Sequence, residues 1–137
     1  MADVFSQIKR SEIMKAIRSE DTIPEMKIRK ALHGLGHRFR LHARHLPGNP
    51  DIILPKYHTA IQVRGCFWHG HSCRDGHTPQ SRRAYWRPKL EKTKRRDYRN
   101  DASLRRKGWR LLVVWECRIR TSSGVAREIA RIQKSFA

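Results

Sequence analysis

The sequence predicts an α/β domain, and three observations lead to this expectation. Extended patterns at residues 51–54 and 60–64 form a hairpin, residues 109–115 are the most apolar run, and helical patterns flank them. The apolar run is expected to be a buried central strand. A chain of 137 residues is expected to be one domain with a single modest core. We therefore expect a central sheet covered by helices.

The first part of the chain is expected to hold an arm and two helices. Residues 1–10 are predicted to form the arm, and apolar residues at helical spacing in 11–17 predict a short helix. Thr22 and Glu25 have the spacing of a capping box, in which the glutamate accepts from the N–H of Thr22. Glu25 is therefore either a helix cap or a catalytic carboxylate. The second helix is expected to end at Gly36 and to bury Ile28, Ala31, Leu32 and Leu35.

The remaining elements follow in order. Residues 37–43 are expected to form a basic strand, and a turn at 47–50 precedes the hairpin. Residues 74–87 are predicted to be a polar loop, and Pro88 to begin a long charged helix that ends before Gly108. A last amphipathic helix is expected from about Ser123, with Val125, Ile129, Ile132 and Phe136 facing inward.

The composition indicates a partner that carries many negative charges. Thirty-one Lys and Arg against twelve Asp and Glu give a formal net charge of +19. Such a surplus is typical of nucleic-acid binding, because neutralised phosphates release condensed counterions. A membrane is the rival partner, but no apolar stretch is long enough to span one, and no signal-peptide pattern opens the chain. Charge alone does not separate an enzyme from an architectural binder.

The cysteines predict a metal site. Three cysteines without an export signal indicate a reducing cytoplasm and metal ligation rather than disulfides. Cys66, His71 and Cys73 could supply three ligands, and Cys117 could complete a tetrahedron. Thiolate and imidazole are the donors that Zn²⁺ prefers, and a closed Cys₃His set is typical of a structural zinc. The alternative is three unrelated buried thiols beside surface histidines.

Two further residues indicate chemistry. His69 lies beside the predicted zinc, where a closed site needs no fifth ligand. Pro50-Asp51, followed by Gln62-x-Arg64 on the next strand, has the layout of the Pro-Asp…(Asp/Glu)-x-Lys nucleases. In that layout Asp51 would hold Mg²⁺ against a scissile phosphate, since a hard cation needs oxygen ligands. The pattern becomes specific when it is joined to the zinc motif.

Together these motifs resemble one family, the very short patch repair (Vsr) endonucleases, over most of the chain. The residues that carry the resemblance are Arg10-Ser11, Met14, Ala16-Ile17, Glu25, Leu46-Pro47-Gly48, Pro50-Asp51, Gly65-Cys66-Phe67-Trp68-His69-Gly70-His71, Cys73, Trp86, Lys89, Arg96-Asp97, Gly108-Trp109 and Val114-Trp115-Glu116-Cys117. The string from Gly65 to Cys73, followed by Trp115-Glu116-Cys117, is hard to obtain by chance.

The resemblance implies a restriction-endonuclease-like fold of the PD-(D/E)xK type, with a central mixed sheet and a structural zinc. It also implies a Mg²⁺-dependent enzyme that nicks DNA on the 5′ side of the mismatched thymine in a T:G pair. Asp51 would bind Mg²⁺ with the main-chain carbonyl of Val63, and His69 would be the acid/base group, assisted by Glu25. Four residues would hold the zinc: Cys66, His71, Cys73 and Cys117. Residues at the DNA would be Met14, Phe67, Trp68, Trp86 and Lys89.

The sequence departs from the family pattern at three positions. Gln62 and Arg64 stand where the family usually has an aromatic residue and a histidine, and Thr93 stands where it has asparagine. Arg64 keeps a positive charge near the phosphate but cannot act as a general base. Acid/base duty would therefore fall more heavily on His69.

The leading interpretation is a mismatch-directed nicking endonuclease, monomeric and bacterial, acting at the nucleoid in the cytoplasm. Residues 1–20 would contact DNA as an arm and helix of a single 1–137 domain, and mismatch-repair proteins are expected partners. One alternative is a related nuclease that cuts without a mismatch. Another is a catalytically silent, zinc-stapled DNA-binding module, although such a binder has no need of Asp51 or His69.

Overall fold

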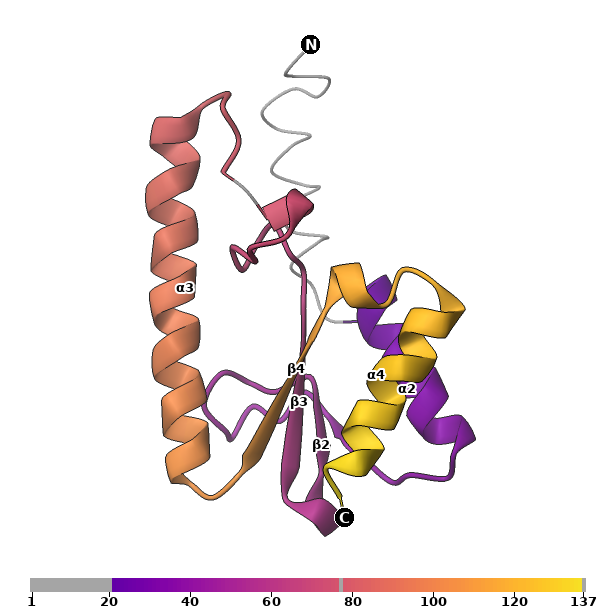
Figure 1. Ribbon diagram of the computed structural model, residues 1–137. Coiled ribbons are helices and arrows are strands. Elements are labelled where there is room, and N and C mark those ends of the chain that lie inside the picture. Colours follow the sequence, from indigo (N-terminus) through magenta and orange to yellow (C-terminus); the bar gives the residue numbers. More distant parts are fainter. Residues whose placement is uncertain (1–20, 77, 137) are drawn as a thin grey trace.

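The computed structural model describes residues 21–76 and 78–136 as a sheet between two layers of helices (Figure 1). The predicted arm and first helix, with Met14, lie outside the described residues. Among the described residues, no helix has both the length and the apolar character needed to cross a bilayer.

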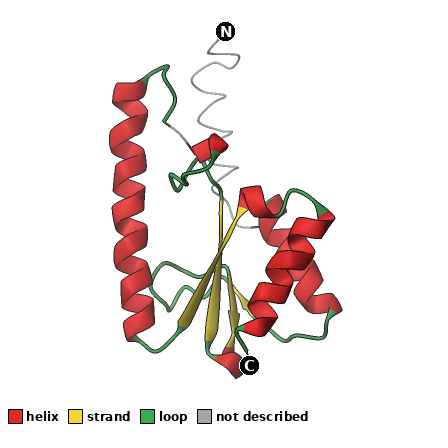
Figure 2. Ribbon diagram, in the orientation of Figure 1, coloured by secondary structure: helices red, strands yellow, loops and turns green. Residues whose placement is uncertain are grey.

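Four strands form the sheet, in the order β1-β2-β3-β4. Figure 2 shows the strands in yellow between the red helices. Their bounds are β1 Arg40–Leu41, β2 Ile52–Leu54, β3 Thr59–Arg64 and β4 Arg110–Trp115. The first three strands pair antiparallel, and a short 3₁₀ turn, η1 (Pro55–Tyr57), connects β2 to β3. β4 runs parallel to β3, with Arg64 beside Trp115. The expected hairpin and mixed sheet are confirmed.

Helices cover both faces of this sheet. α2 (Ile23–Gly34) and α4 (Ser122–Lys134) lie on one face, and α3 (Arg83–Arg106) lies on the other (Figure 1). Strand residues alternate between the faces, so β2 sends Ile52 and Leu54 toward α2 and α4 but Ile53 toward α3. The α2–α4 core contains Ile28, Leu32, Ile52, Leu54, Ile61, Val114, Ile119, Ile129 and Ile132. The α3 core contains Ala43, Ile53, Ala60, Leu104 and Leu111.

The ends of α2 follow the sequence expectation except at Leu35 and at the Glu25 side chain, which does not accept from the N–H of Thr22. The Thr22 hydroxyl accepts from the N–H of Glu25 at 3.4 Å, as a capping residue does. Gly36 adopts the left-handed region with φ 81°, which ends the helix. Leu35 is 54% exposed rather than buried, because it is the C-cap residue and no longer on the helix's inner face.

The long helix begins earlier than its proline suggests. α3 starts at Arg83, so Tyr85 and Trp86 are helical and the expected loop 74–87 is wrong in its last five residues. Pro88 lies inside the helix, where it cannot donate to the carbonyl of Ala84. Trp86 is only 7% exposed, and burying its ring offsets part of that loss. A 3₁₀ turn, η2 (Arg74–Gly76), also lies within the expected loop.

Two strands differ from expectation. β1 spans two residues instead of the predicted 37–43. β4 is an edge strand of the described sheet rather than a central one. Its apolar run arises because helices cover both of its faces, and Arg131 Nη2 donates to the exposed-edge carbonyl of Val113 at 2.8 Å.

Candidate active site and metal centre

The parallel pairing of β3 and β4 brings a Cys/His cluster together. Cys66 follows β3, and Cys117 lies in the 3₁₀ turn η3 (Glu116–Arg118) that follows β4. One ligand atom from each of Cys66, His71, Cys73 and Cys117 lies within 4.8 Å of the others. The N–H of Cys117 points at Cys66 Sγ at 3.4 Å, and Cys117 Sγ lies 3.6 Å from His71 Nδ1. These four predicted residues are therefore arranged as a metal site.

The surroundings of the cluster suit a cation. Burial, together with the neighbouring thiols, raises the pKa of Cys66 to about 12, so its thiolate needs a positive charge beside it. Burial and Arg118 lower the pKa of His71, which favours the neutral imidazole that a metal requires. The His71 ring also stacks on Trp115 at 4.1 Å. A Cβ on Gly76 would lie 1.7 Å from the His71 carbonyl oxygen, so this loop closes only with glycine there.

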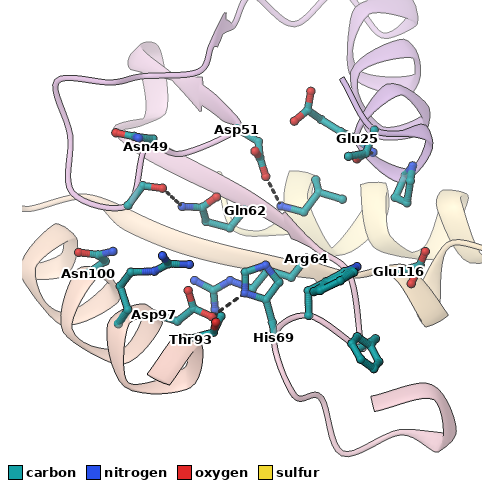
Figure 3. A pocket seen from close by; sticks show the side chains of 18 of the residues that line it. Glu25, Asn49, Asp51, Gln62, Arg64, His69, Thr93, Asp97, Asn100 and Glu116 are labelled. Atoms are coloured by element: carbon teal, nitrogen blue, oxygen red, sulfur yellow. Dashed lines mark hydrogen bonds and ion pairs between the residues drawn. The ribbon is translucent and has the colours of Figure 1, made fainter. Parts of the chain in front are cut away.

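A second set of residues lines a cavity of about 1050 Å³ beside the cluster. The cavity lies where the start of α2, the carboxyl ends of β3 and β4, and the middle of α3 meet. Figure 3 shows Asp51 and Glu25 on one side of this space and His69, Asp97 and Arg64 on the other. The predicted residues Asp51, Glu25, Val63, Arg64 and His69 all line it.

Asp51 is held in place by the backbone of β3. Its Oδ2 accepts from the N–H of Val63 at 2.7 Å. Burial, opposed by this hydrogen bond and reinforced by the nearby Glu25 carboxylate, raises the pKa of Asp51 to about 7. Two carboxylates that approach one another in a partly buried cavity favour a shared proton or a bound cation.

Glu25 is 2% exposed and does more than cap its helix. Its Oε2 accepts a hydrogen bond from the N–H of Asp21 at 3.2 Å, whereas a capping box requires the N–H of Thr22 as donor. The same oxygen accepts a second hydrogen bond from Arg29 Nη2 at 2.5 Å. His42 Nε2 lies 3.6 Å from the same oxygen. Asp21, Glu25 and His42 also meet the geometric condition for a metal group, but the Arg29 guanidinium contacts both carboxylates and supplies the positive charge.

His69 forms a dyad with an acidic residue of α3. Its Nδ1 lies 2.6 Å from Asp97 Oδ2, and both side chains are largely buried. Burial alone would raise the pKa of Asp97. The hydrogen bond from His69 and the positive charges of Arg64 and Arg96 together lower this pKa below its ordinary value. The bond to Nδ1 leaves Nε2 of His69 as the nitrogen available for proton transfer.

Arg64 and Gln62 each have a partner. Arg64 donates from both terminal nitrogens to Asp101, at 2.6 and 3.1 Å, and is 8% exposed. Gln62 Nε2 donates to the carbonyl of Gly48 at 3.0 Å. Gly48 has φ 77°, and a Cβ there would lie 3.2 Å from Asn100 and 3.3 Å from Gln62, so the 47–50 turn packs closely between β3 and α3.

The aromatic residues of the motif pack against one another. Phe67, Trp68 and Trp86 meet edge to face with ring centroids 4.9 to 5.8 Å apart. Phe67 and Trp68 are half-buried and line the cavity, whereas Trp86 is nearly buried behind them. The Lys89 ammonium lies 5.8 Å from the Trp86 ring and 5.4 Å from Tyr85. The surface next to the cavity therefore combines two accessible rings with a cation.

Sequence reasoning named Asp97 without giving it a role, and it missed Asp101 and the Arg29–His42 pair as members of this site. Asp97 and Asp101 are one turn apart on a helix whose other charges are mostly basic, and this was the available signal. No pattern of spacing places Arg29 and His42 together, because the contact depends on the path of residues 35–42.

Comparisons with known proteins identify relatives of this chain. Residues 2–75 match the family model "DNA mismatch endonuclease Vsr". The chain is 48% identical over 119 residues to "Type II nicking enzyme V.XorIIP" of Xanthomonas oryzae, covering 87% of this chain and 88% of that protein. It is 41% identical over 136 residues to "Type II nicking enzyme V.NmeAIP" of Neisseria meningitidis, covering 99% and 97%.

A third relative carries the family name. "DNA mismatch endonuclease Vsr" of Escherichia coli is 41% identical over 120 residues, covering 88% of this chain and 77% of that protein. The match of the family model over more than half of the chain and these three relatives make the protein a DNA endonuclease. The chain belongs to the Vsr family of DNA mismatch endonucleases.

Proposed function

We propose that this Vsr-family endonuclease is Mg²⁺-dependent and nicks duplex DNA on the 5′ side of the mismatched thymine in a T:G pair. The observation that carries the proposal is the meeting of Asp51, Glu25 and His69 around one cavity. The whole 1–137 chain would act as a single restriction-endonuclease-like domain, consistent with the mixed sheet and its flanking helices.

The acidic side of the cavity would bind the cation. Asp51 is the natural Mg²⁺ ligand, beside the main-chain carbonyl of Val63 and oxygens of the phosphate. Bound Mg²⁺ would stabilise charge on the phosphate and help to ionise water. Glu25, fixed by Arg29, would assist from the start of α2.

The basic side would manage the proton and the phosphate. His69, oriented by Asp97 through Nδ1, would exchange a proton at Nε2 with the attacking water or the leaving oxygen. Arg64 would add positive potential near the phosphate. Both of its terminal nitrogens already donate to Asp101, so it would act through its charge rather than through a direct hydrogen bond to the phosphate.

The Cys/His cluster would hold a structural zinc. Three thiols and an imidazole within 4.8 Å match the donor set of closed zinc sites. The metal would join the loop after β3 to the turn after β4 and thereby fix His69, which lies in that loop.

The half-buried rings would read the mismatch. Phe67 and Trp68, supported by Trp86 and aided by Met14, would enter the base stack, and Lys89 would contact phosphate. Opening a base pair costs least at a mismatch, so rings that fill the opening favour T:G over matched DNA. We propose that the enzyme works as a monomer in the bacterial cytoplasm, with mismatch-repair proteins as partners.

A nuclease that cuts without a mismatch is the second candidate. The observation that favours it is Thr93, whose hydroxyl donates to the carbonyl of Lys89 at 3.2 Å and so is bound within its own helix. Thr93 lines the cavity, yet offers little to a mismatched base in this arrangement.

The test of catalysis is cleavage of a T:G duplex labelled on each strand, with and without Mg²⁺. We expect one nick, 5′ of the mismatched thymine, only when Mg²⁺ is present. Asp51→Asn should bind the duplex but not nick it, and His69→Ala should nick about 10²–10⁴-fold more slowly. Wild-type cleavage by His69→Ala, or nicking by Asp51→Asn, would contradict the assignment.

A further inference from the structure

A second hollow, of about 510 Å³, lies at the opposite end of the strands from the catalytic cavity. It is lined by Tyr57, His58, Arg105, Gly108, Trp109, Arg110 and Leu111. His58 immediately precedes β3, whereas the cavity begins around Gln62 and Val63 near its other end. At about 3.3 Å per strand residue, the two sites lie on the order of 15 Å apart along the sheet.

The floor of this hollow is a pair of stacked rings. His58 lies over Trp109 with ring centroids 4.0 Å apart and planes inclined by 16°. His58 is exposed although Trp109 covers one face of its ring, so the exposed area of this residue lies away from Trp109. Tyr57 beside it already stacks on Phe136 at 3.9 Å. The open face of His58 is therefore the surface that another flat ring could cover.

The rim of the hollow carries cations that nothing in residues 21–76 and 78–136 neutralises. Arg105 and Arg110 are exposed, and neither guanidinium group forms a hydrogen bond or ion pair with a described residue. Only their backbone groups are bonded: the N–H of Arg110 donates to the carbonyl of His58, and the carbonyl of Arg105 accepts from the N–H of Gly108. Asp101, one helical turn before Arg105, uses both carboxylate oxygens on Arg64. The framing segments 52–63 and 102–115 contain no Asp or Glu.

We propose that this hollow is a second nucleic-acid site that binds single-stranded DNA, with one base on the open face of His58 and its phosphate between Arg105 and Arg110. A volume of about 510 Å³ is within the range of small-ligand pockets, and a nucleotide fits that class. Aromatic rings beside unpaired cations are the combination by which proteins hold single strands without reading sequence.

The stacked His58 and Trp109 rings favour single-stranded over duplex DNA as the ligand. Arginines alone would accept any phosphate backbone, but a duplex hides the faces of its bases in its own stack. Only an unpaired base can cover His58. The site is also separate from the cavity in which the scissile phosphate would lie, so one protein molecule could hold a duplex and a strand together.

The test measures binding of a labelled oligothymidine to the wild-type protein saturated with T:G duplex, in buffer without Mg²⁺. We expect binding that an unlabelled oligothymidine competes and that additional duplex does not. An abasic oligonucleotide of equal length should bind about tenfold more weakly, because it keeps the phosphates and loses the stacking. This comparison uses the unaltered protein and does not depend on a variant folding.

Variants then locate the site. His58→Asn removes the ring, and asparagine tolerates the left-handed backbone that His58 adopts at φ 50°. We expect it to weaken oligothymidine about tenfold but to leave abasic binding unchanged. Arg105→Gln with Arg110→Gln should weaken both ligands and nick T:G duplex at the wild-type rate.

The control carries the same charge change elsewhere. Arg127→Gln with Lys134→Gln removes two exposed cations of α4 and should alter oligothymidine affinity by less than about twofold. The proposal is overturned if the wild type binds no oligothymidine beside the duplex, if abasic and normal strands bind equally, or if the control loses as much affinity as Arg105→Gln with Arg110→Gln. If the wild type binds oligothymidine as described but does not nick T:G duplex, the result counts against the catalytic assignment alone.

Discussion

Single residues in the proposed catalytic cavity form pairs in which a charged partner fixes a side chain. Asp97 holds His69, Arg29 holds Glu25, and Asp101 holds Arg64. Each pair is partly buried, so breaking one leaves a charge in a poorly solvated place. The partners are therefore expected to affect catalysis without touching the substrate.

The first prediction concerns Asp97 as a positioning residue. Asp97→Asn should lower the single-turnover nicking rate about 10²-fold, because the carboxylate that orients the His69 ring is lost, while T:G affinity stays within about twofold. Asp97→Glu should recover part of the rate. In a His69→Ala background the same change should cost little more, since both residues serve one step. Additive losses in that double variant would show that Asp97 acts separately.

The second prediction follows from the carboxyl group of Asp51. Its pKa in the folded protein is raised to about 7, against about 3.9 for an unfolded chain. The folded state therefore holds the proton more tightly, so this contribution to stability is complete below about pH 4 and is lost as pH rises through 7.

Without added Mg²⁺, the wild type should lose stability relative to Asp51→Asn between about pH 5 and 8. The difference should be a few kcal/mol, since one pKa unit corresponds to about 1.4 kcal/mol. Urea unfolding of both proteins at the two pH values measures it. Equal changes in the two proteins would mean that Asp51 is already ionised in the folded state at pH 5.

At the scale of elements, the site depends on the two parallel strands ending together. β3 leads into the Cys66–Cys73 loop and β4 into η3, so the Cys/His cluster ties together segments about 50 residues apart. Besides the Cys/His cluster, that loop is held by the His69–Asp97 hydrogen bond, the His71–Trp115 stack and the aromatic group. A metal there is expected to decide whether the loop is ordered.

Cys117→Ser should therefore lose zinc and unfold or aggregate at ordinary temperature. Structural zinc contributes on the order of 10–16 kcal/mol of apparent binding free energy, which is comparable to the stability of a whole domain. The matched control is His69→Ala, which alters the same site but no proposed zinc ligand and should keep one zinc per chain. Metal analysis and thermal unfolding of both variants check this. A stoichiometric zinc content in folded Cys117→Ser would remove that ligand from the set.

The elements also show how far sequence patterns reach. The hairpin, the Thr22 cap and the clustering of the four Cys/His side chains were predictable, because each depends on local spacing or on one strong chemical preference. The start of α3 was not, since the helix includes Pro88 and buries the Trp86 ring, which the sequence pattern had assigned to a loop. The edge position of β4 was not predictable either. An apolar run indicates that both faces of a strand are covered, but it does not indicate how many strands pair with it.

At the scale of the whole molecule, many of the described acidic side chains lie around one cavity. Within the described residues, Asp21, Glu25, Asp51, Asp97 and Glu116 all line the proposed catalytic cavity, in a chain of net charge +19. Cations outside the cavity would attract DNA of any sequence, and the acidic interior would then require a divalent cation before the phosphate could enter. Binding and discrimination are thus expected to depend on different residues.

Trp68→Ala separates these two roles. Removing a half-buried ring at the cavity should weaken T:G binding by more than matched binding, because base–aromatic stacking is worth about 1–3 kcal/mol and matters most where the stack opens. Arg99→Gln, which removes an exposed cation of α3, should weaken both duplexes alike and flatten the salt dependence if it contacts phosphate. Equilibrium titrations at two salt concentrations compare them. Equal losses on both duplexes for Trp68→Ala would assign the ring to general packing.

The central claim is that this cavity nicks DNA because of a mismatch. The most direct measurement is the single-turnover nicking rate in Mg²⁺ on two duplexes of one sequence that differ only in a T:G or a T:A pair. The account predicts rapid nicking 5′ of the mismatched thymine and at least about 10²-fold slower cleavage of the matched duplex, as the opening costs of a few kcal/mol imply. Equal rates on the two duplexes would contradict it and identify a nuclease that cuts regardless of the mismatch.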